Sequence, residues 1–188
     1  MDPLGRRKIV SSDDELLVLV DATDRTIGTL DKSACHDGRG VLHRAFSLFV
    51  FNSAGELLIQ QRQADKRLWP SYWSNSCCSH PRAGEDIANA VGRRLAEELG
   101  VNADLTFLYK FEYTARFGDV GTEHELCWVY VGRSDQDPVV NTAEVQAWRW
   151  ISRDLLTEEL SSNPDSFTPW FTMEWRRLTD EFERQLPA

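Results

Sequence analysis

Two long runs of strand-forming residues constrain the fold of this chain most strongly. Residues 105–117 and 122–132 are rich in aromatic and β-branched side chains, and a short connection that contains glycine separates them. Consecutive runs of this kind predict two strands, because aromatic and β-branched side chains pack well on a pleated sheet. We therefore expect a sheet that is mixed or mostly antiparallel.

Five more apolar or alternating segments extend the predicted sheet. Residues 16–20 and 26–30 flank a polar turn, and residues 45–51 and 56–62 flank an Asn-Ser-Ala-Gly connection. Asparagine and glycine suit tight turns, so the second pair predicts a hairpin. Residues 146–152, which are rich in tryptophan, predict a further strand.

Two segments have the apolar periodicity of helices. In residues 85–99 an apolar side chain recurs every four residues, acidic residues occupy the first turn, and Gly100 follows as a stop signal. Residues 168–184 have a similar apolar face, which should pack on the sheet. The predicted fold class is α/β in the broad sense (α+β), a mixed sheet flanked by helices. We expect one domain, residues 16–188, after a flexible N-terminal extension of residues 1–15.

Composition and charge exclude several classes of function. The 188 residues are 41% hydrophobic, which is enough for a full core in one domain. A net charge of -9 repels a phosphate backbone, so nucleic acid is not an expected partner. The apolar run at residues 16–20 is too short for a signal peptide or a membrane span. We therefore expect a cytoplasmic protein without a membrane partner, whose four cysteines are reduced thiols.

Histidines and a pair of glutamates indicate a metal site. Three of the four histidines lie in loop-like sequence, where ligand-binding residues often occur. Glu123 and Glu125 alternate in a predicted strand and point to one face, whereas His124 points to the other. Imidazole and carboxylate together suit a first-row divalent ion, and the candidate ligands are His36, His43, His80, Glu123 and Glu125. Spacing alone leaves open that these are ordinary surface residues.

A thiol and several basic side chains are further candidates. Cys78 lies two residues before His80, where a nearby cation would make a thiol reactive, although Cys77 and Cys78 could instead be inert buried cysteines. In an acidic protein, a cluster of basic side chains would form a local anion site. Its candidates are Lys32, Arg62, Lys66 and Arg94, for which ordinary solvated side chains are the alternative.

Two motifs resemble those of the type I isopentenyl-diphosphate isomerases. Residues 75–81 read Asn-Ser-Cys-Cys-Ser-His-Pro, and residues 93–100 read Arg-Arg-Leu-Ala-Glu-Glu-Leu-Gly. The resemblance covers nearly the whole chain, because it extends to residues 30–36, 43–47 and 167–170. It implies a Nudix-type fold, a mixed and mostly antiparallel sheet between helices, in which residues 85–100 are similar to the Nudix helix.

Two departures from the Nudix box bear on the function. Ser79 stands where the box begins with glycine, and Arg94 replaces one of its glutamates. A Nudix-type diphosphate hydrolase that needs this carboxylate is therefore disfavoured, and it is the alternative enzyme. A domain in which the same ligands only hold a structural metal is a second alternative.

The resemblance also implies a role for each candidate residue. Cys78 matches the catalytic thiol and Glu125 the second catalytic group, with Tyr113 assisting. The implied ligands of the enzyme-bound metal, which is manganese, magnesium or zinc, are His36, His43, His80, Glu123 and Glu125. Glu98 is implied as a ligand of a Mg²⁺ ion that binds with the substrate diphosphate. The implied substrate-binding residues are Lys32, Arg62, Lys66, Arg94 and Trp170.

The implied reaction interconverts isopentenyl diphosphate and dimethylallyl diphosphate in isoprenoid biosynthesis. An isolated alkene is a poor base, so a shift of its double bond requires a proton donor on one side of the carbon skeleton and an acceptor on the other. Protonation of the terminal carbon gives a tertiary cation, which an aromatic ring such as that of Trp170 stabilises. The expected partner is a small isoprenoid diphosphate, and the expected assembly is a monomer or a weak homo-oligomer.

Overall fold

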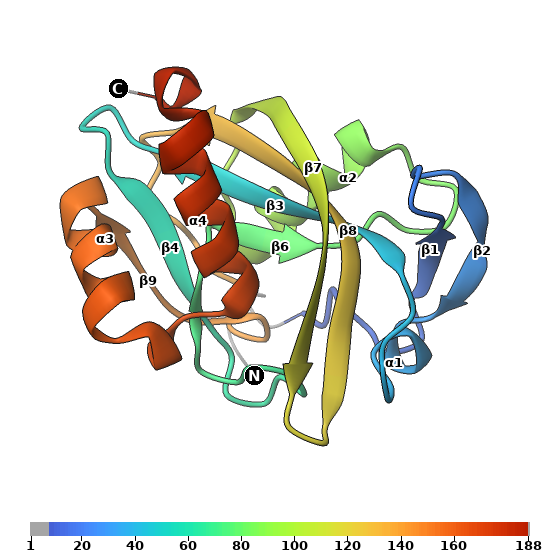
Figure 1. Ribbon diagram of the computed structural model, residues 1–188. Helices are drawn as coiled ribbons and strands as arrows, with labels where there is room; N and C mark the ends of the chain where they lie inside the picture. Colours follow the sequence, from blue (N-terminus) through green and yellow to red (C-terminus); the bar gives the residue numbers. More distant parts are fainter. Residues whose placement is uncertain (1–7, 188) are drawn as a thin grey trace.

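The computed structural model describes residues 8–187, and within this range the chain forms one mixed β-sheet with helices on both faces (Figure 1). The strands of the described range are β1 (Leu16–Val20), β2 (Thr26–Asp31), β3 (His43–Phe51), β4 (Leu57–Arg62), β5 (Trp73–Ser74), β6 (Cys77–Ser79), β7 (Asp104–Phe117), β8 (Gly121–Arg133) and β9 (Val145–Ile151). The α-helices are α1 (Lys32–Cys35), α2 (Ile87–Leu99), α3 (Arg153–Ser162) and α4 (Pro169–Glu181), and short 3-10 helices lie at Pro164–Ser166 and Glu183–Gln185.

Strand β3 is at the centre of this sheet. It pairs antiparallel with β1, β4 and β6, and parallel with β8. The sheet continues through the antiparallel β7–β8 hairpin on one side, and through β5 and β9, both antiparallel to β4, on the other. The predicted mixed, mostly antiparallel sheet is therefore confirmed. In the parallel pair His43 lies opposite Glu125, which brings two distant parts of the sequence together.

The longer elements begin and end close to their predicted bounds. The predicted strands become β1 to β4 and β7 to β9 with shifts of at most two residues at either end, and the first predicted helix begins at Ile87 rather than residue 85. The second predicted helix is shorter than expected, because α4 ends at Glu181 and Arg184 lies in a 3-10 turn. Helices α1 and α3 and the short strands β5 and β6 were not predicted. Strands of two and three residues are too short to show a periodicity.

Helices cover the two faces of the sheet and form two cores. Helix α4 lies across the front face in Figure 1, where Phe171 packs with Phe49 and Val129. Helix α2 lies behind the sheet, where Leu95 packs with Phe46 and Leu48. Successive residues of β3 alternate between these cores, so the strand is apolar on both faces and reads as one continuous hydrophobic run.

Specific residues set both ends of α2. Asp86 is the N-cap, and its side chain accepts a hydrogen bond from Ala88 N (2.8 Å). Gly100 ends the helix with a φ of 65°, and a Cβ atom at this position would lie 2.9 Å from Val139 O. Glycine meets both requirements because it tolerates left-handed backbone and close backbone contact.

Residues 8–15 lie against the body of the fold. Asn141 holds Lys8 through two hydrogen bonds, which join Lys8 N to Oδ1 (3.2 Å) and Nδ2 to Lys8 O (2.6 Å). Val10 is 7% exposed, and Ser33 N donates a hydrogen bond to Asp13 O (3.1 Å). Residues 1–7 lie outside the described range, so the predicted domain boundary and the flexibility of the extension stay predictions. None of the described helices is long and apolar enough to cross a membrane.

Candidate active site

A cavity of about 520 Å³ gathers the candidate residues from distant parts of the sequence. Its lining includes all of them except His43, which is fully buried. The lining candidates are Lys32, His36, Arg62, Lys66, Cys78, His80, Arg94, Glu98, Tyr113, Glu123, Glu125 and Trp170. The structure therefore brings the predicted metal, proton-transfer and anion-binding groups to one place.

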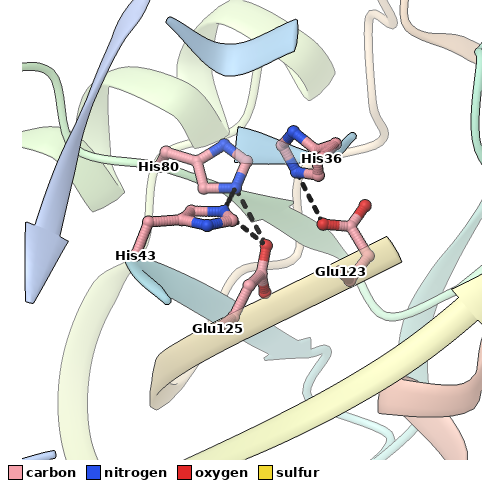
Figure 2. A group of neighbouring side chains, drawn as sticks. All are labelled: His36, His43, His80, Glu123 and Glu125. Atoms are coloured by element: carbon pink, nitrogen blue, oxygen red, sulfur yellow. Dashed lines mark hydrogen bonds and ion pairs between the residues drawn. The ribbon is translucent and has the colours of Figure 1, made fainter. Parts of the chain in front are cut away.

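Five buried side chains converge on one point of this site (Figure 2). His36 follows α1, His43 begins β3, His80 follows β6, and Glu123 and Glu125 point inward from β8. One potential ligand atom from each residue lies within 4.8 Å of all the others. The predicted alternation of Glu123 and Glu125 on one face of a strand is thus confirmed.

Backbone carbonyl groups orient two of the imidazoles towards this point. His36 Nδ1 lies 2.6 Å from Lys32 O, and His43 Nδ1 lies 2.7 Å from Val41 O. A carbonyl oxygen only accepts hydrogen bonds, so each Nδ1 carries a proton and a neutral ring presents the lone pair of Nε2. The His43 and His80 Nε2 atoms lie 3.1 Å apart, and His36 Nε2 lies 2.7 Å from Glu123 Oε2.

The charge states of His80 and Glu125 fit a divalent cation. Burial lowers the pKa of His80 to about 4 despite the nearby Glu125 carboxylate, so its ring is neutral at pH 7. Burial acts to raise the pKa of Glu125, but contacts with His43 and His80 hold it well below the usual range. Neutral imidazole and ionised carboxylate are the forms that coordinate metals. Burial acts to lower the pKa of His36, but the Glu123 carboxylate raises it, so a bound cation would take the place of a proton on His36. Glu123 and Glu125 are buried close together, so a nearby positive charge would stabilise both carboxylates.

Cys78 and Glu125, the pair expected to transfer protons, both line the cavity. Burial raises the pKa of the Cys78 thiol to about 12, and the Arg62 guanidinium, whose Nη1 lies 3.8 Å from Sγ, opposes this in part. Glu125 Oε2 accepts a hydrogen bond of 2.6 Å from the Tyr113 hydroxyl. Cys77 is fully buried in the core under α2, so only Cys78 of the two adjacent thiols lines the cavity.

Trp170 supplies an aromatic wall beside the thiol. It lies in the first turn of α4, and its Nε1 donates a hydrogen bond of 3.1 Å to Ser74 Oγ. Ser74 Oγ also lies 3.9 Å from Cys78 Sγ and 2.9 Å from Thr168 Oγ1. The Arg62 guanidinium carbon lies 5.3 Å from the centre of the Trp170 ring. Ser74 therefore links the aromatic wall to the thiol.

The four basic candidates also line the cavity, and each has partners in the protein. Arg62 donates hydrogen bonds to the carbonyl groups of Leu68 (3.0 Å) and Trp69 (3.1 Å). Lys66 forms an ion pair with Glu144, and Lys32 donates a hydrogen bond to Ser11 Oγ. Arg94, which is 2% exposed, contacts Val10 O and the Glu98 carboxylate.

Three polar residues near the site were not predicted from the sequence. Ser74 and Glu144 lie in segments without a periodic pattern, and their partners are distant in the sequence. Glu174 is fully buried on α4, four residues after Trp170, and Cys127 Sγ lies 3.4 Å from its Oε1. The sequence did offer a sign that Glu174 is unusual, because this acidic residue interrupts the apolar face of the predicted helix.

Comparison with known proteins places the chain in a family. A family model described as NUDIX domain matches residues 41–171. Isopentenyl-diphosphate Delta-isomerase 1 of Photorhabdus laumondii is 48% identical over 86% of this chain and 93% of that protein. Isopentenyl-diphosphate Delta-isomerase of Burkholderia multivorans is 47% identical over 84% of this chain and 89% of that protein, and the Frankia alni protein of the same name is 42% identical over 90% and 88%.

Solved structures confirm the fold. DR0079 from Deinococcus radiodurans superimposes with a TM-score of 0.72 at 24% identity, over 87% of this chain and 98% of that chain. A MutT protein from Methanosarcina mazei superimposes with a TM-score of 0.60 at 16% identity, over 74% of this chain and 94% of that chain. The NUDIX match covers more than half of the chain, and the curated relatives align over most of their length. The chain belongs to the isopentenyl-diphosphate Delta-isomerase family of NUDIX-domain proteins.

Proposed function

We propose that the protein interconverts isopentenyl diphosphate and dimethylallyl diphosphate by two proton transfers. One observation carries this proposal beyond the family assignment: a thiol and a carboxylate, Cys78 and Glu125, line the same cavity as a cluster of cations. The cations suit the diphosphate of the substrate, and the thiol and carboxylate suit a reaction that needs one proton donor and one acceptor.

The proposed reaction moves one proton onto the substrate and another off it. A proton is added to the terminal alkene carbon of isopentenyl diphosphate, which leaves a positive charge on the tertiary carbon. A proton then leaves the adjacent methylene group, and its C–H electron pair forms the new double bond. Cys78 and Glu125 are the proposed donor and acceptor pair, and they exchange roles when the reaction runs in reverse. Tyr113 holds one oxygen of Glu125 through its hydroxyl group.

Trp170 is proposed to stabilise the tertiary cation. The face of an indole ring attracts positive charge by about 0.5 to 2 kcal/mol, with the larger values in desolvated sites. Trp170 is 3% exposed and lines the cavity. The hydrogen bond from its Nε1 to Ser74 fixes the plane of the ring, so the face that meets the substrate is already oriented before binding.

The proposed metal ligands are His36, His43, His80, Glu123 and Glu125, and manganese, magnesium and zinc all remain candidates. A divalent ion at this point would supply the positive charge that balances two buried carboxylates. Glu98 is proposed to bind a Mg²⁺ ion that enters with the diphosphate, next to the cations Lys32, Arg62, Lys66 and Arg94.

The remaining features of the proposal concern partners and location. The expected partner is a small isoprenoid diphosphate, and we expect neither nucleic acid nor membrane to bind. A monomer or weak homo-oligomer in the cytoplasm stays the prediction from the sequence.

Incubation with isopentenyl diphosphate and magnesium in deuterated water tests the proposed reaction. We expect NMR spectra to show dimethylallyl diphosphate that carries solvent deuterium, without release of inorganic phosphate or diphosphate. Release of phosphate without the allylic product would instead identify a diphosphate hydrolase. A folded, metal-bound protein that converts no isopentenyl diphosphate would contradict the proposed reaction and favour a domain that only binds a metal.

A further inference from the structure

A buried carboxylate lies among the cations of the cavity. Glu144 is 4% exposed and lines the cavity immediately before β9. One of its oxygens forms an ion pair with Lys66, and the other lies 3.4 Å from the backbone N of Val10. No role for this residue follows from the metal site or from the proton-transfer pair, so its presence in an anion-binding cavity needs an explanation.

The charge of Glu144 reaches several of the basic candidates. Burial and the neighbouring Lys66 lower the pKa of Lys32, and Glu144 opposes them. Burial acts to lower the pKa of Arg94, and Glu98, with a smaller contribution from Glu144, raises it. Arg94 is buried and Lys32 and Lys66 are partly buried, so these cations would repel one another without a nearby anion. The negative charge of Glu144 therefore stabilises the same cations that a bound diphosphate would stabilise.

Backbone contacts hold Glu144 in place. The backbone of residues 141–144 forms a tight turn, with a hydrogen bond of 2.9 Å from Glu144 N to Asn141 O. Gln63 N donates to Glu144 O (3.0 Å), and Asn141 N donates to Glu98 O (2.8 Å), so the turn is attached both to the loop that carries Lys66 and to the end of α2. A movement of this turn would have to break these backbone hydrogen bonds.

We propose that Glu144 is a resident anion of the diphosphate site, which neutralises Lys66 in the free enzyme and competes with the diphosphate for it. This inference rests on the proposed function, because it takes the cations of the cavity as the diphosphate-binding residues. Glu144 stays close to the bound diphosphate and repels it, so it weakens the binding of substrate and product alike. As a result, the cations are stabilised when no diphosphate is bound, and the product dissociates more readily.

A purely structural role for Glu144 predicts the opposite sign. If the carboxylate only positioned Lys66 and residues 8–10, its removal would disorder the cations and weaken diphosphate binding. If it bound a cation that enters with the diphosphate, its removal would also weaken binding. Only a competing anion gives tighter binding when its charge is removed.

The test is isothermal titration of the metal-loaded protein with magnesium and inorganic diphosphate. We compare wild type with Glu144→Gln, and use Glu159→Gln as the matched control. Glu159 contacts Arg149 (3.0 Å), neither residue lines the cavity, and the substitution changes the net charge by the same amount. We expect Glu144→Gln to bind inorganic diphosphate about tenfold more tightly than wild type, and Glu159→Gln to bind within about twofold of it.

Binding that is unchanged or weaker in Glu144→Gln overturns the inference, and so does equal tightening in both variants. A wild-type protein that does not bind inorganic diphosphate overturns the diphosphate site itself, and with it the proposed function. If circular dichroism shows that Glu144→Gln is unfolded, Glu144→Asp replaces it. The aspartate side chain is shorter by one methylene group, which moves the carboxylate away from Lys66. Glu144→Asp must therefore still bind inorganic diphosphate more tightly than wild type, by a smaller factor than expected for Glu144→Gln.

Discussion

The hydroxyl group of Tyr113 donates a hydrogen bond of 2.6 Å to Glu125 Oε2 across the β7–β8 hairpin, in which the two residues are opposite partners. The bond is buried, and the other oxygen of Glu125 faces His80 at 2.9 Å. Each carboxylate oxygen therefore has a different partner. The strand pairing thus sets which oxygen faces the phenol and which faces the metal ligands.

Tyr113→Phe should lower kcat by about ten- to hundredfold with little change in KM. A hydrogen bond to a charged group contributes about 1.5 to 3 kcal/mol, and its loss leaves Glu125 poorly oriented for proton transfer. Steady-state kinetics measures both constants. Tyr109→Phe is the control, because Tyr109 lies on the same strand outside the cavity and donates only a long bond of 3.5 Å to Glu174 O. A similar loss in both variants would contradict a specific role for Tyr113.

Cys78→Ala should abolish most turnover and keep the fold, with a loss of about 100- to 10 000-fold. Cys77→Ala should keep most of the activity, because its thiol lies in the core on the other face of the sheet. Its expected effect is a loss of about 1 kcal/mol in the free energy of unfolding. Turnover assays and urea titrations of both variants make the comparison. Equal loss of activity in the two variants would contradict the assignment of Cys78 as the catalytic thiol.

Ser74→Ala should lower both stability and turnover. The substitution removes the acceptor for Trp170 Nε1 and leaves this buried N–H without its partner, at a cost of about 1 to 3 kcal/mol. Trp170 is then free to rotate, and we expect kcat to fall by about tenfold. Thr168→Val is the control, since it removes a hydroxyl that contacts Ser74 but touches neither Trp170 Nε1 nor Cys78. Loss of turnover in the control alone would contradict this role for Ser74.

The stability of the metal-free protein should depend on pH through Glu174. Burial raises the pKa of Glu174 to about 8 from an ordinary value of 4.5. The unfolded chain loses this proton near pH 4.5 and the folded protein keeps it, so the free energy of unfolding falls as pH rises towards 8. Glu174→Gln should therefore be more stable than wild type at pH 9, by up to about 5 kcal/mol, and the difference should shrink towards pH 4.

Urea titrations in EDTA at several pH values measure this effect. Glu158→Gln is the control, because it removes the same charge from an exposed position on α3. A Glu174→Gln variant that differs from wild type by a constant amount at every pH would show that Glu174 is ionised in the fold.

Local patterns in the sequence predicted the long elements and part of the site. The period of two placed Glu123 and Glu125 on one face of β8, and the structure confirms this. The period of about four predicted α2, in which Arg94 and Glu98 lie one turn apart on the buried face. These relationships lie within single elements, so the sequence alone determines them.

Contacts between distant segments could not be predicted in this way. Glu144 meets Lys66 across 78 residues and Val10 across 134 residues, and no local pattern encodes either pair. The parallel pairing of β3 with β8 likewise aligns His43 with Glu125 only once the sheet has formed. The resemblance to a family, rather than periodicity, indicated that the histidines and glutamates share one site.

Strand β6 is paired with β3 through three residues, with Ser47 opposite Cys78 and Leu48 opposite Cys77. A slip of one residue would turn Cys77 into the cavity and bury Cys78 under α2. Ser76 Oγ donates to Leu58 O (2.6 Å) and accepts from Val50 N (2.8 Å), while Asn75 Nδ2 donates to Leu48 O (3.2 Å). Asn75 and Ser76 thus fix the register that decides which of two chemically identical thiols faces the cavity. A substitution of Asn75 or Ser76 that shifts this register would keep every reactive group in the protein, but Cys77 rather than Cys78 would face the cavity.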